Sequence, residues 1–236
     1  MSSVQDLGRD MMARHGFMGV NVSMFEQAGR EQLIALLAQG LLPELKLLEF
    51  GCGCLRIAYW LVRFLDPGCY YALEPARRRV EIGLEWLFTP QERAIKQPRF
   101  DYNPDFDSSV FGVPFDFFLA RSIWSHASKR QIETMLDAFV RDSKPSSIFL
   151  TSYFPVEPAD PDYRNRLAVE FARQQHQGDY QGDSWVGTSH ESETLGVVQH
   201  STAWILERCS SRGLAVTELP EIDCDGQSWL RIARRP

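Results

Sequence analysis

Residues 47–56 read LLEFGCGCLR, a short apolar run that ends in two glycines. The run predicts a buried strand over Lys46–Phe50. Glycines at the end of a strand let the backbone turn sharply and approach a ligand closely. Apolar residues then follow at positions i, i+3, i+4 and i+7 from Ile57, which predicts a helix. Because a helix N-terminus attracts negative groups, the strand, turn and helix together indicate a cofactor-binding unit.

Helices and strands alternate on both sides of this stretch. We expect strands over residues 46–50, 69–73, 100–103, 115–120, 147–153, 214–219 and 228–234. Further helices are expected after a capping box at Ser23–Glu26, along the stripe Val80–Leu84–Leu87, after the cap Ser128, and over Trp204–Arg212, which Gly213 ends. The last two strands leave no room for a crossover helix, so they are expected to pair antiparallel.

This order of elements predicts an α/β fold. The sheet is expected to be Rossmann-like, doubly wound, seven-stranded and mainly parallel, with one antiparallel strand near the C-terminus and helices on both faces. At 236 residues the chain suits one domain, residues 1–236. Within it we expect an N-terminal helical cap over residues 1–40. Residues 155–200 are polar and rich in Pro, Gly and Gln, and we interpret them as a lid-like insert after strand five.

Charge and cysteine content narrow the class of protein. The net charge of -6 argues against a nucleic-acid partner, which usually requires a basic face. No apolar run is long enough for a membrane helix, and the polar N-terminus lacks a signal-peptide core. The five cysteines match neither a disulfide scaffold nor a zinc spacing, so no metal site is expected. Free thiols favour a cytoplasmic location. The oligomeric state stays open.

The glycine turn fits NAD, FAD or S-adenosylmethionine, and three details separate them. The dinucleotide pattern G-x-G-x-x-G needs a small residue where this chain has Arg56. Glu49 lies directly before the turn, where a carboxylate repels a pyrophosphate but tolerates a cationic sulfonium. A terminal helix–strand–strand unit is also unusual for a dinucleotide domain. A glycine turn that only joins strand to helix is the structural alternative.

The stretch Glu49-Phe50-Gly51-Cys52-Gly53 resembles motif I of the class I S-adenosylmethionine-dependent methyltransferases. Leu55 stands where the third glycine of that motif is expected, and a G-C-G-x-L-R variant also occurs in the family. Glu74, which follows the second strand, resembles the acidic residue that binds the ribose hydroxyls of the cofactor; a solvated strand-end carboxylate is the alternative.

The resemblance implies further site residues. Asp105 and Phe106 resemble the pair that holds the adenine, although Asp101 competes for that role. Residues 115–122 resemble motif IV, whose end lines the methionine part of the cofactor. The cofactor-binding residues implied are Glu49, Gly51, Cys52, Gly53, Arg56, Glu74, Pro75, Asp105, Phe106, Arg121 and Ser122.

His126, which follows strand four, is the candidate general base, because an imidazole titrates near neutral pH. The alternative is that His126 only caps or packs its loop. Trp185 and Tyr163 in the insert are candidates for stacking on an organic acceptor, with packing of the insert as the alternative.

The sequence thus predicts a methyltransferase that uses S-adenosylmethionine, releases S-adenosylhomocysteine, and methylates O or N of a small-molecule acceptor. The alternatives are a cofactor-binding module without catalysis and a nicotinamide-dependent oxidoreductase.

Overall fold

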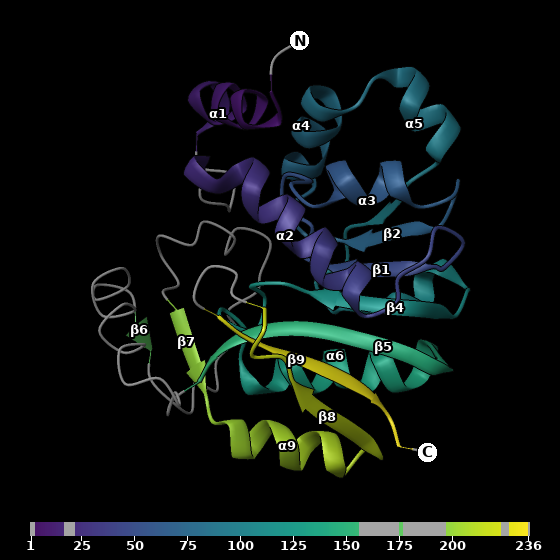
Figure 1. The fold of residues 1–236 in the computed structure, drawn as a ribbon, viewed down its shortest axis with the longest axis vertical. Coiled ribbons are helices and arrows are strands. Elements are labelled where there is room, and N and C mark those ends of the chain that lie inside the picture. Colours follow the sequence, from purple (N-terminus) through teal and green to yellow (C-terminus); the bar gives the residue numbers. More distant parts are fainter. Residues whose placement is uncertain (1–2, 17–21, 156–174, 177–196, 223–226, 236) are drawn as a thin grey trace.

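A computed structural model describes residues 3–16, 22–155, 175–176, 197–222 and 227–235. Within these residues, seven strands form the central sheet (Figure 1). They are β1 (Leu47–Phe50), β2 (Tyr70–Leu73), β3 (Arg99–Asp101), β4 (Phe115–Ala120), β5 (Ser143–Pro155), β8 (Leu214–Glu218) and β9 (Ser228–Arg234). Their spatial order is β3-β2-β1-β4-β5-β9-β8.

The pairing of the strands confirms the mixed sheet expected from the sequence. Strands β3, β2, β1, β4 and β5 are mutually parallel, while β9 runs antiparallel to both of its neighbours, β5 and β8. The far end of β5 also pairs in parallel with β7 (Val197–His200), which in turn pairs with β6 (Gln175–His176). The strand order reverses between β1 and β4, and open α/β sheets bind ligands beside such a reversal.

Helices cover both faces of the sheet, as Figure 1 shows. The helices α1 (Val4–His15), α2 (Phe25–Ala38), α3 (Ala58–Phe64) and α4 (Arg77–Leu87) contribute to one apolar cluster, and α6 (Lys129–Asp142) and α9 (Thr202–Ser210) contribute to the other. Alternate residues of β1 feed the two clusters, since Leu47 belongs to the first and Leu48 to the second. All four residues of β1 are buried, which explains its continuous apolar character.

One predicted helix start is wrong. The expected capping box at Ser23–Glu26 does not form, because α2 begins at Phe25 after the 3₁₀ turn η1 (Val22–Met24) and has no side-chain cap from its N-cap Met24. A residue of α1 supplies the partner instead: the Gln5 side chain accepts from the Glu26 N–H (3.1 Å), and the Glu26 carboxylate accepts from the Gln5 N–H (3.2 Å). Packing between two helices therefore replaces the local motif.

The structure also contains helices that the sequence analysis did not specify. Helix α5 (Pro90–Lys96) starts with a complete capping box, in which Thr89 and Glu92 exchange hydrogen bonds. Helix α1 lies in the expected N-terminal cap and reaches α4, where the Trp86 indole donates to His15 Nε2 (3.2 Å). The 3₁₀ turn η2 (Ser108–Phe111) precedes β4. Tyr163 and Trp185, together with most of the expected insert over 155–200, lie outside the described residues.

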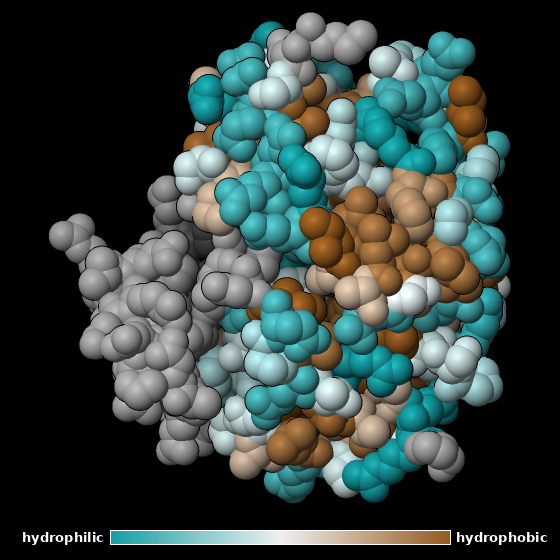
Figure 2. Space-filling view, viewed as in Figure 1, coloured by the Kyte–Doolittle hydropathy of each residue, from teal (hydrophilic) through white to brown (hydrophobic). Residues whose placement is uncertain are grey.

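The outer face of α2 leaves apolar side chains exposed. Figure 2 shows apolar residues gathered over the C-terminal half of α2 and over α3, and the exposed members include Ile34 and Leu37. In the part of the chain that the structure describes, no helix is both long enough and apolar enough to cross a membrane.

Candidate functional site

The strand register brings three predicted site residues to the same edge of the sheet. Phe50 lies opposite Leu73, so the next residues along β1 and β2 are Gly51 and Glu74. On the other side of β1, Glu49 lies opposite Leu119 of β4, and Arg121 is the first residue after that strand. These positions flank the reversal in strand order between β1 and β4, where ligands bind in this class of sheet.

The glycine loop follows a strained backbone path. Gly51, Gly53 and Leu55 all have positive φ, at 71°, 52° and 68°. The Gly51 N–H donates to the Leu73 carbonyl (2.8 Å), which ties the start of the loop to β2. Glycine adopts this left-handed region without steric cost, but leucine does so at a cost of ~1–2 kcal/mol. Leu55 therefore has a backbone conformation that favours glycine, and its buried side chain offsets the strain.

Glu74 binds the glycine loop directly. Its carboxylate accepts from the Gly53 N–H (2.8 Å) and from the Ala76 N–H (2.9 Å), and the residue is 2% exposed. Burial raises the pKa of this carboxyl, and the two backbone donors and the charge of Arg79 oppose the rise. The carboxylate oxygens are hydrogen-bond acceptors at the edge of the sheet where ligands bind in this class of fold.

Glu49 is a second buried carboxyl under the same loop. It is 3% exposed and accepts a hydrogen bond from the Tyr70 hydroxyl (2.6 Å). Burial raises its pKa to about 7; the Tyr70 hydrogen bond opposes the rise, Glu74 adds to it, and Arg56 and Arg121 oppose it. Hydrogen bonds or electrostatic interactions therefore connect five predicted site residues around the loop: Glu49, Gly53, Arg56, Glu74 and Arg121.

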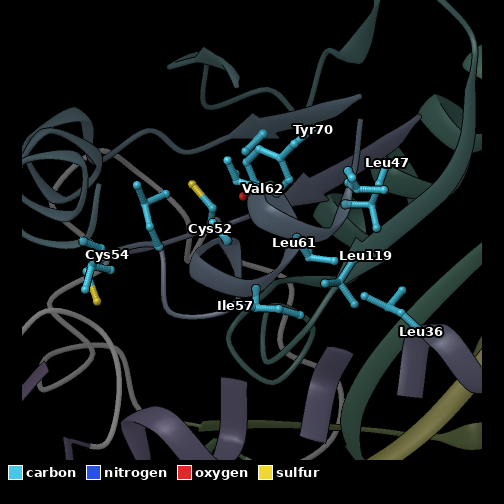
Figure 3. Close-up of a cluster of buried hydrophobic side chains, with 14 of the residues drawn as sticks. Leu36, Leu47, Cys52, Cys54, Ile57, Leu61, Val62, Tyr70 and Leu119 are labelled. Carbon is cyan, nitrogen blue, oxygen red and sulfur yellow. The ribbon is translucent and has the colours of Figure 1, made fainter. Parts of the chain in front are cut away.

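The side chains of the two cysteines of the loop pack into the core. Both are fully or almost fully buried free thiols, and burial raises the pKa of each, to about 12 for Cys54. Figure 3 shows Cys52 directed toward Tyr70, whereas Cys54 points away from it. Thiols that stay protonated are poor nucleophiles and poor metal ligands. Among the described residues, no three His, Cys, Asp or Glu side chains are grouped to hold a metal ion.

The predicted residues after β2 and β3 differ in exposure. Pro75 is half-buried beside Glu74, and Asp105 is exposed. Phe106 has a positive φ of 55°, is 2% exposed, and packs edge-on against Phe50 at a ring distance of 5.9 Å. Its ring therefore belongs to the core beneath the site.

The loop after β4 carries the remaining predicted residues and is held at both ends. Near its start, the Ser122 N–H donates to Ser152 Oγ (2.8 Å). Near its end, His200 Nε2 lies 3.0 Å from the Ala127 carbonyl. Between these contacts His126 is half-buried, with its N–H bonded to the Ile123 carbonyl (2.9 Å).

Several residues that contact the predicted site residues or their loops were missed by the sequence analysis. Tyr70, Ser152, His200 and Gln227 each make a side-chain hydrogen bond to or beside the predicted residues. The role of Tyr70 could not be predicted, because an aromatic residue at this position is typical of any buried strand. The other three come from distant parts of the chain, and their pairing carries no local signal.

A separate shallow cavity of about 490 Å³ lies between α1 and α2. Its lining residues are Gln5, Ser23, Glu26, Gln27, Arg30, Glu31 and Ile34. None of the predicted site residues contributes to it. The register and hydrogen bonds at the glycine loop are the stronger guide to the site, because they gather buried carboxyls where this fold binds ligands.

Comparison with known proteins gives structural matches only. No family model matches the sequence, and no curated protein matches it. Magnesium protoporphyrin IX methyltransferase from Synechocystis PCC 6803, solved with bound SAH, superposes with a TM-score of 0.58 at 16% identity over 98% of this chain and 94% of that one. A DhpI–SAH complex matches with a TM-score of 0.60 at 15% identity over both full lengths.

Mitomycin 7-O-methyltransferase matches with a TM-score of 0.61 at 17% identity, over 99% of this chain but 61% of that protein. All three similar structures match the fold of this chain over nearly its whole length. The chain has the class I methyltransferase fold. This confirms the predicted fold class, including the antiparallel strand β9 near the C-terminus.

The left-handed backbone of Leu55 leads to a test by substitution. Leu55→Ala keeps the strain and loses about 2–5 kcal/mol of packing, whereas Leu55→Gly loses the same packing and relieves the strain. We expect Leu55→Gly to be the more stable of the two in urea denaturation. The matched pair Leu61→Ala and Leu61→Gly, in the regular helix α3, should show the opposite order. The same order at both positions would contradict a strained Leu55.

The buried Glu49 carboxyl should make stability depend on pH. Its pKa is about 7 in the folded chain against 4.5 when exposed, so between these values the folded state holds the extra proton. Stability is therefore highest below pH 4.5 for this group and falls as the pH rises through 7. Between pH 5 and 8, the free energy of unfolding measured in urea should fall by on the order of 3 kcal/mol less in Glu49→Gln than in the unsubstituted protein. The exposed control Glu44→Gln should leave this fall unchanged, and an equally steep loss in Glu49→Gln would refute the assignment.

Proposed function

We propose that this protein is an enzyme that transfers a methyl group from S-adenosylmethionine to an oxygen or nitrogen of a small-molecule acceptor. The observation that carries the proposal is the buried Glu74 carboxylate at the end of β2. It accepts a hydrogen bond from the Gly53 N–H in the loop after β1. This contact lies in a sheet whose antiparallel strand β9 matches methyltransferase structures.

The residues around the loop fit an S-adenosyl ligand. Glu74 would hold the ribose hydroxyls, because a carboxylate accepts hydrogen bonds from two vicinal hydroxyls. A cationic ligand stabilises the ionised forms of Glu49 and Glu74, whose pKa values burial raises, whereas a pyrophosphate opposes those ionised forms. The N–H groups at the start of α3, together with Arg56, would receive the carboxylate of the ligand. When bound, S-adenosylmethionine supplies an electrophilic methyl group on a sulfonium sulfur.

The chain's own part in the reaction is alignment and proton removal. Arg121 and Ser122 start the loop after β4, whereas Pro75 follows β2 and Asp105 and Phe106 follow β3. We propose that these five residues complete the cofactor site. Alignment of reactants contributes up to ~7–11 kcal/mol to such a displacement. His126, half-buried on the same loop, would accept the proton of an acceptor hydroxyl or amine.

A small organic acceptor is favoured over a macromolecule. The net charge of -6 does not suit a nucleic acid. Two of the similar structures are named for small molecules, magnesium protoporphyrin IX and mitomycin. We further propose a cytoplasmic location, because Cys52, Cys54, Cys69 and Cys209 are free thiols. Cell fractionation tests that location, and recovery outside the cytoplasm would refute it.

A cofactor-binding module without catalysis is the second candidate. It shares the loop and Glu74 and differs only in what the loop after β4 does, so turnover separates the two candidates. A nicotinamide-dependent oxidoreductase fits less well, because β9 is antiparallel and Arg56 fills a glycine position of the dinucleotide motif.

Two variants separate cofactor binding from chemistry. Glu74→Gln should weaken binding of S-adenosylhomocysteine by more than about tenfold, because a charged hydrogen-bond acceptor is lost. His126→Ala should leave that affinity unchanged and slow turnover by about 10²–10⁴-fold. Calorimetric titration measures the first effect, and methyl release with an acceptor found by screening measures the second. Unaltered affinity in Glu74→Gln would remove the ribose assignment, and an unaltered rate in His126→Ala would leave His126 structural.

A further inference from the structure

Ser122, Ser125, Ser152 and Gln227 form a closed hydrogen-bonded network, called the ring below, at the carboxyl ends of β4 and β5. Gln227 Nε2 donates to Ser122 Oγ (2.8 Å), and Ser152 Oγ donates to Gln227 Oε1 (2.8 Å). Ser152 Oγ also accepts from the Ser122 N–H (2.8 Å). Ser125 Oγ lies 3.2 Å from Ser122 Oγ and donates to the Ser122 carbonyl (3.0 Å). Ser125 and Ser152 are fully buried, and Gln227 is 7% exposed.

The direction of every hydrogen bond in this network is fixed. A backbone N–H only donates, so Ser152 Oγ accepts from Ser122 and gives its own proton to Gln227 Oε1. Since the Ser125 hydroxyl donates its one proton to the Ser122 carbonyl, the Ser122 hydroxyl donates to Ser125 Oγ. The chain of donors therefore begins at the Ser122 N–H and ends at the Ser122 carbonyl, with each donor matched to one acceptor.

Gln227 is the member of this network that no other residue type replaces. It must accept from Ser152 and donate to Ser122 at the same time, and a side-chain amide does both. An ionised Glu lacks the donor, Met lacks both groups, and Asn is one methylene shorter. Because a partly satisfied buried network costs more than an apolar one, the complete ring selects a single loop conformation.

The ring holds a strained position. Ser122 has a positive φ of 59°, which costs a non-glycine residue about 1–2 kcal/mol unless its surroundings fix it. The loop turns at this residue, directly after Arg121 and four residues before His126. The contact between His200 and the Ala127 carbonyl fixes the other end of the loop.

We propose that Gln227 is a positioning residue, which through Ser152 and Ser122 holds the loop after β4 in the geometry needed at the cofactor and acceptor site. This inference rests on the proposed function for what the loop does, but the ring itself does not depend on it. Gln227 immediately precedes the antiparallel strand β9, so that strand has a role at the site beyond completing the sheet.

Hydrogen exchange tests the ring without any ligand. In Gln227→Met, the amides of residues 121–127 should exchange about tenfold faster than in the unsubstituted protein, since the Ser122 N–H loses its fixed acceptor. The control is Gln32→Met in α2, because Gln32 is 2% exposed and its Nε2 has no hydrogen-bond partner among the described residues. Exchange over residues 121–127 should not change in the control. Unchanged exchange in Gln227→Met would overturn the proposal.

A double substitution shows whether the contacts act as one ring. Ser152→Ala should accelerate exchange as much as Gln227→Met. The double variant should exchange no faster than either single variant, because each substitution alone already opens the ring. In Gln227→Glu, exchange compared with the unsubstituted protein at the same pH should return to normal as the pH falls, because a protonated Glu both donates and accepts. Additive effects, or no recovery at low pH, would overturn the ring.

Ligand affinity tests the positioning role. Gln227→Met should weaken binding of S-adenosylhomocysteine about tenfold, and Gln32→Met should not. Fast loop exchange with unchanged affinity would overturn the positioning role and leave a structural ring. If the unsubstituted protein binds no S-adenosylhomocysteine, the proposed function fails, while the exchange experiment still decides for or against the ring.

Discussion

The hydrogen bond from the Gly53 N–H to the buried Glu74 carboxylate is the contact on which the site depends. It joins the end of β2 to the loop after β1, and it requires Gly53 to adopt a left-handed backbone. A buried carboxylate is stable only when it is hydrogen-bonded, and the Gly53 N–H of the loop and the Ala76 N–H after β2 supply donors. This interaction thus links the conformation of the loop to a buried acidic group of the site.

A second buried carboxyl, Glu49, makes the region beneath the loop acidic. Tyr70 is its direct partner, while Arg56 and Arg121 act on it through charge. Two carboxyls with so little exposure are costly to ionise, and a nearby cation lowers that cost. This electrostatic balance favours a sulfonium cofactor over a dinucleotide, in agreement with the antiparallel strand β9.

Local patterns predicted most of the fold. The spacing of apolar residues located β1, β4 and the helix capped by Ser128, because each depends on residues close together in the chain. The position of Glu74 beside the glycine loop was also predictable, since Glu74 follows the second strand at a spacing typical of ribose-binding α/β folds. Gln227 was not, because it meets Ser122 across 105 residues and only the strand order brings them together. The capping box at Ser23–Glu26 failed because the contact with Gln5 of α1 replaced it.

The central claim is that the glycine loop and Glu74 bind an S-adenosyl ligand. Calorimetric titration of the full chain with S-adenosylmethionine and S-adenosylhomocysteine, with NAD as the control, tests it most directly. The account predicts saturable one-to-one binding of both adenosyl ligands and none of NAD. Binding of NAD, or of neither adenosyl ligand, would contradict it.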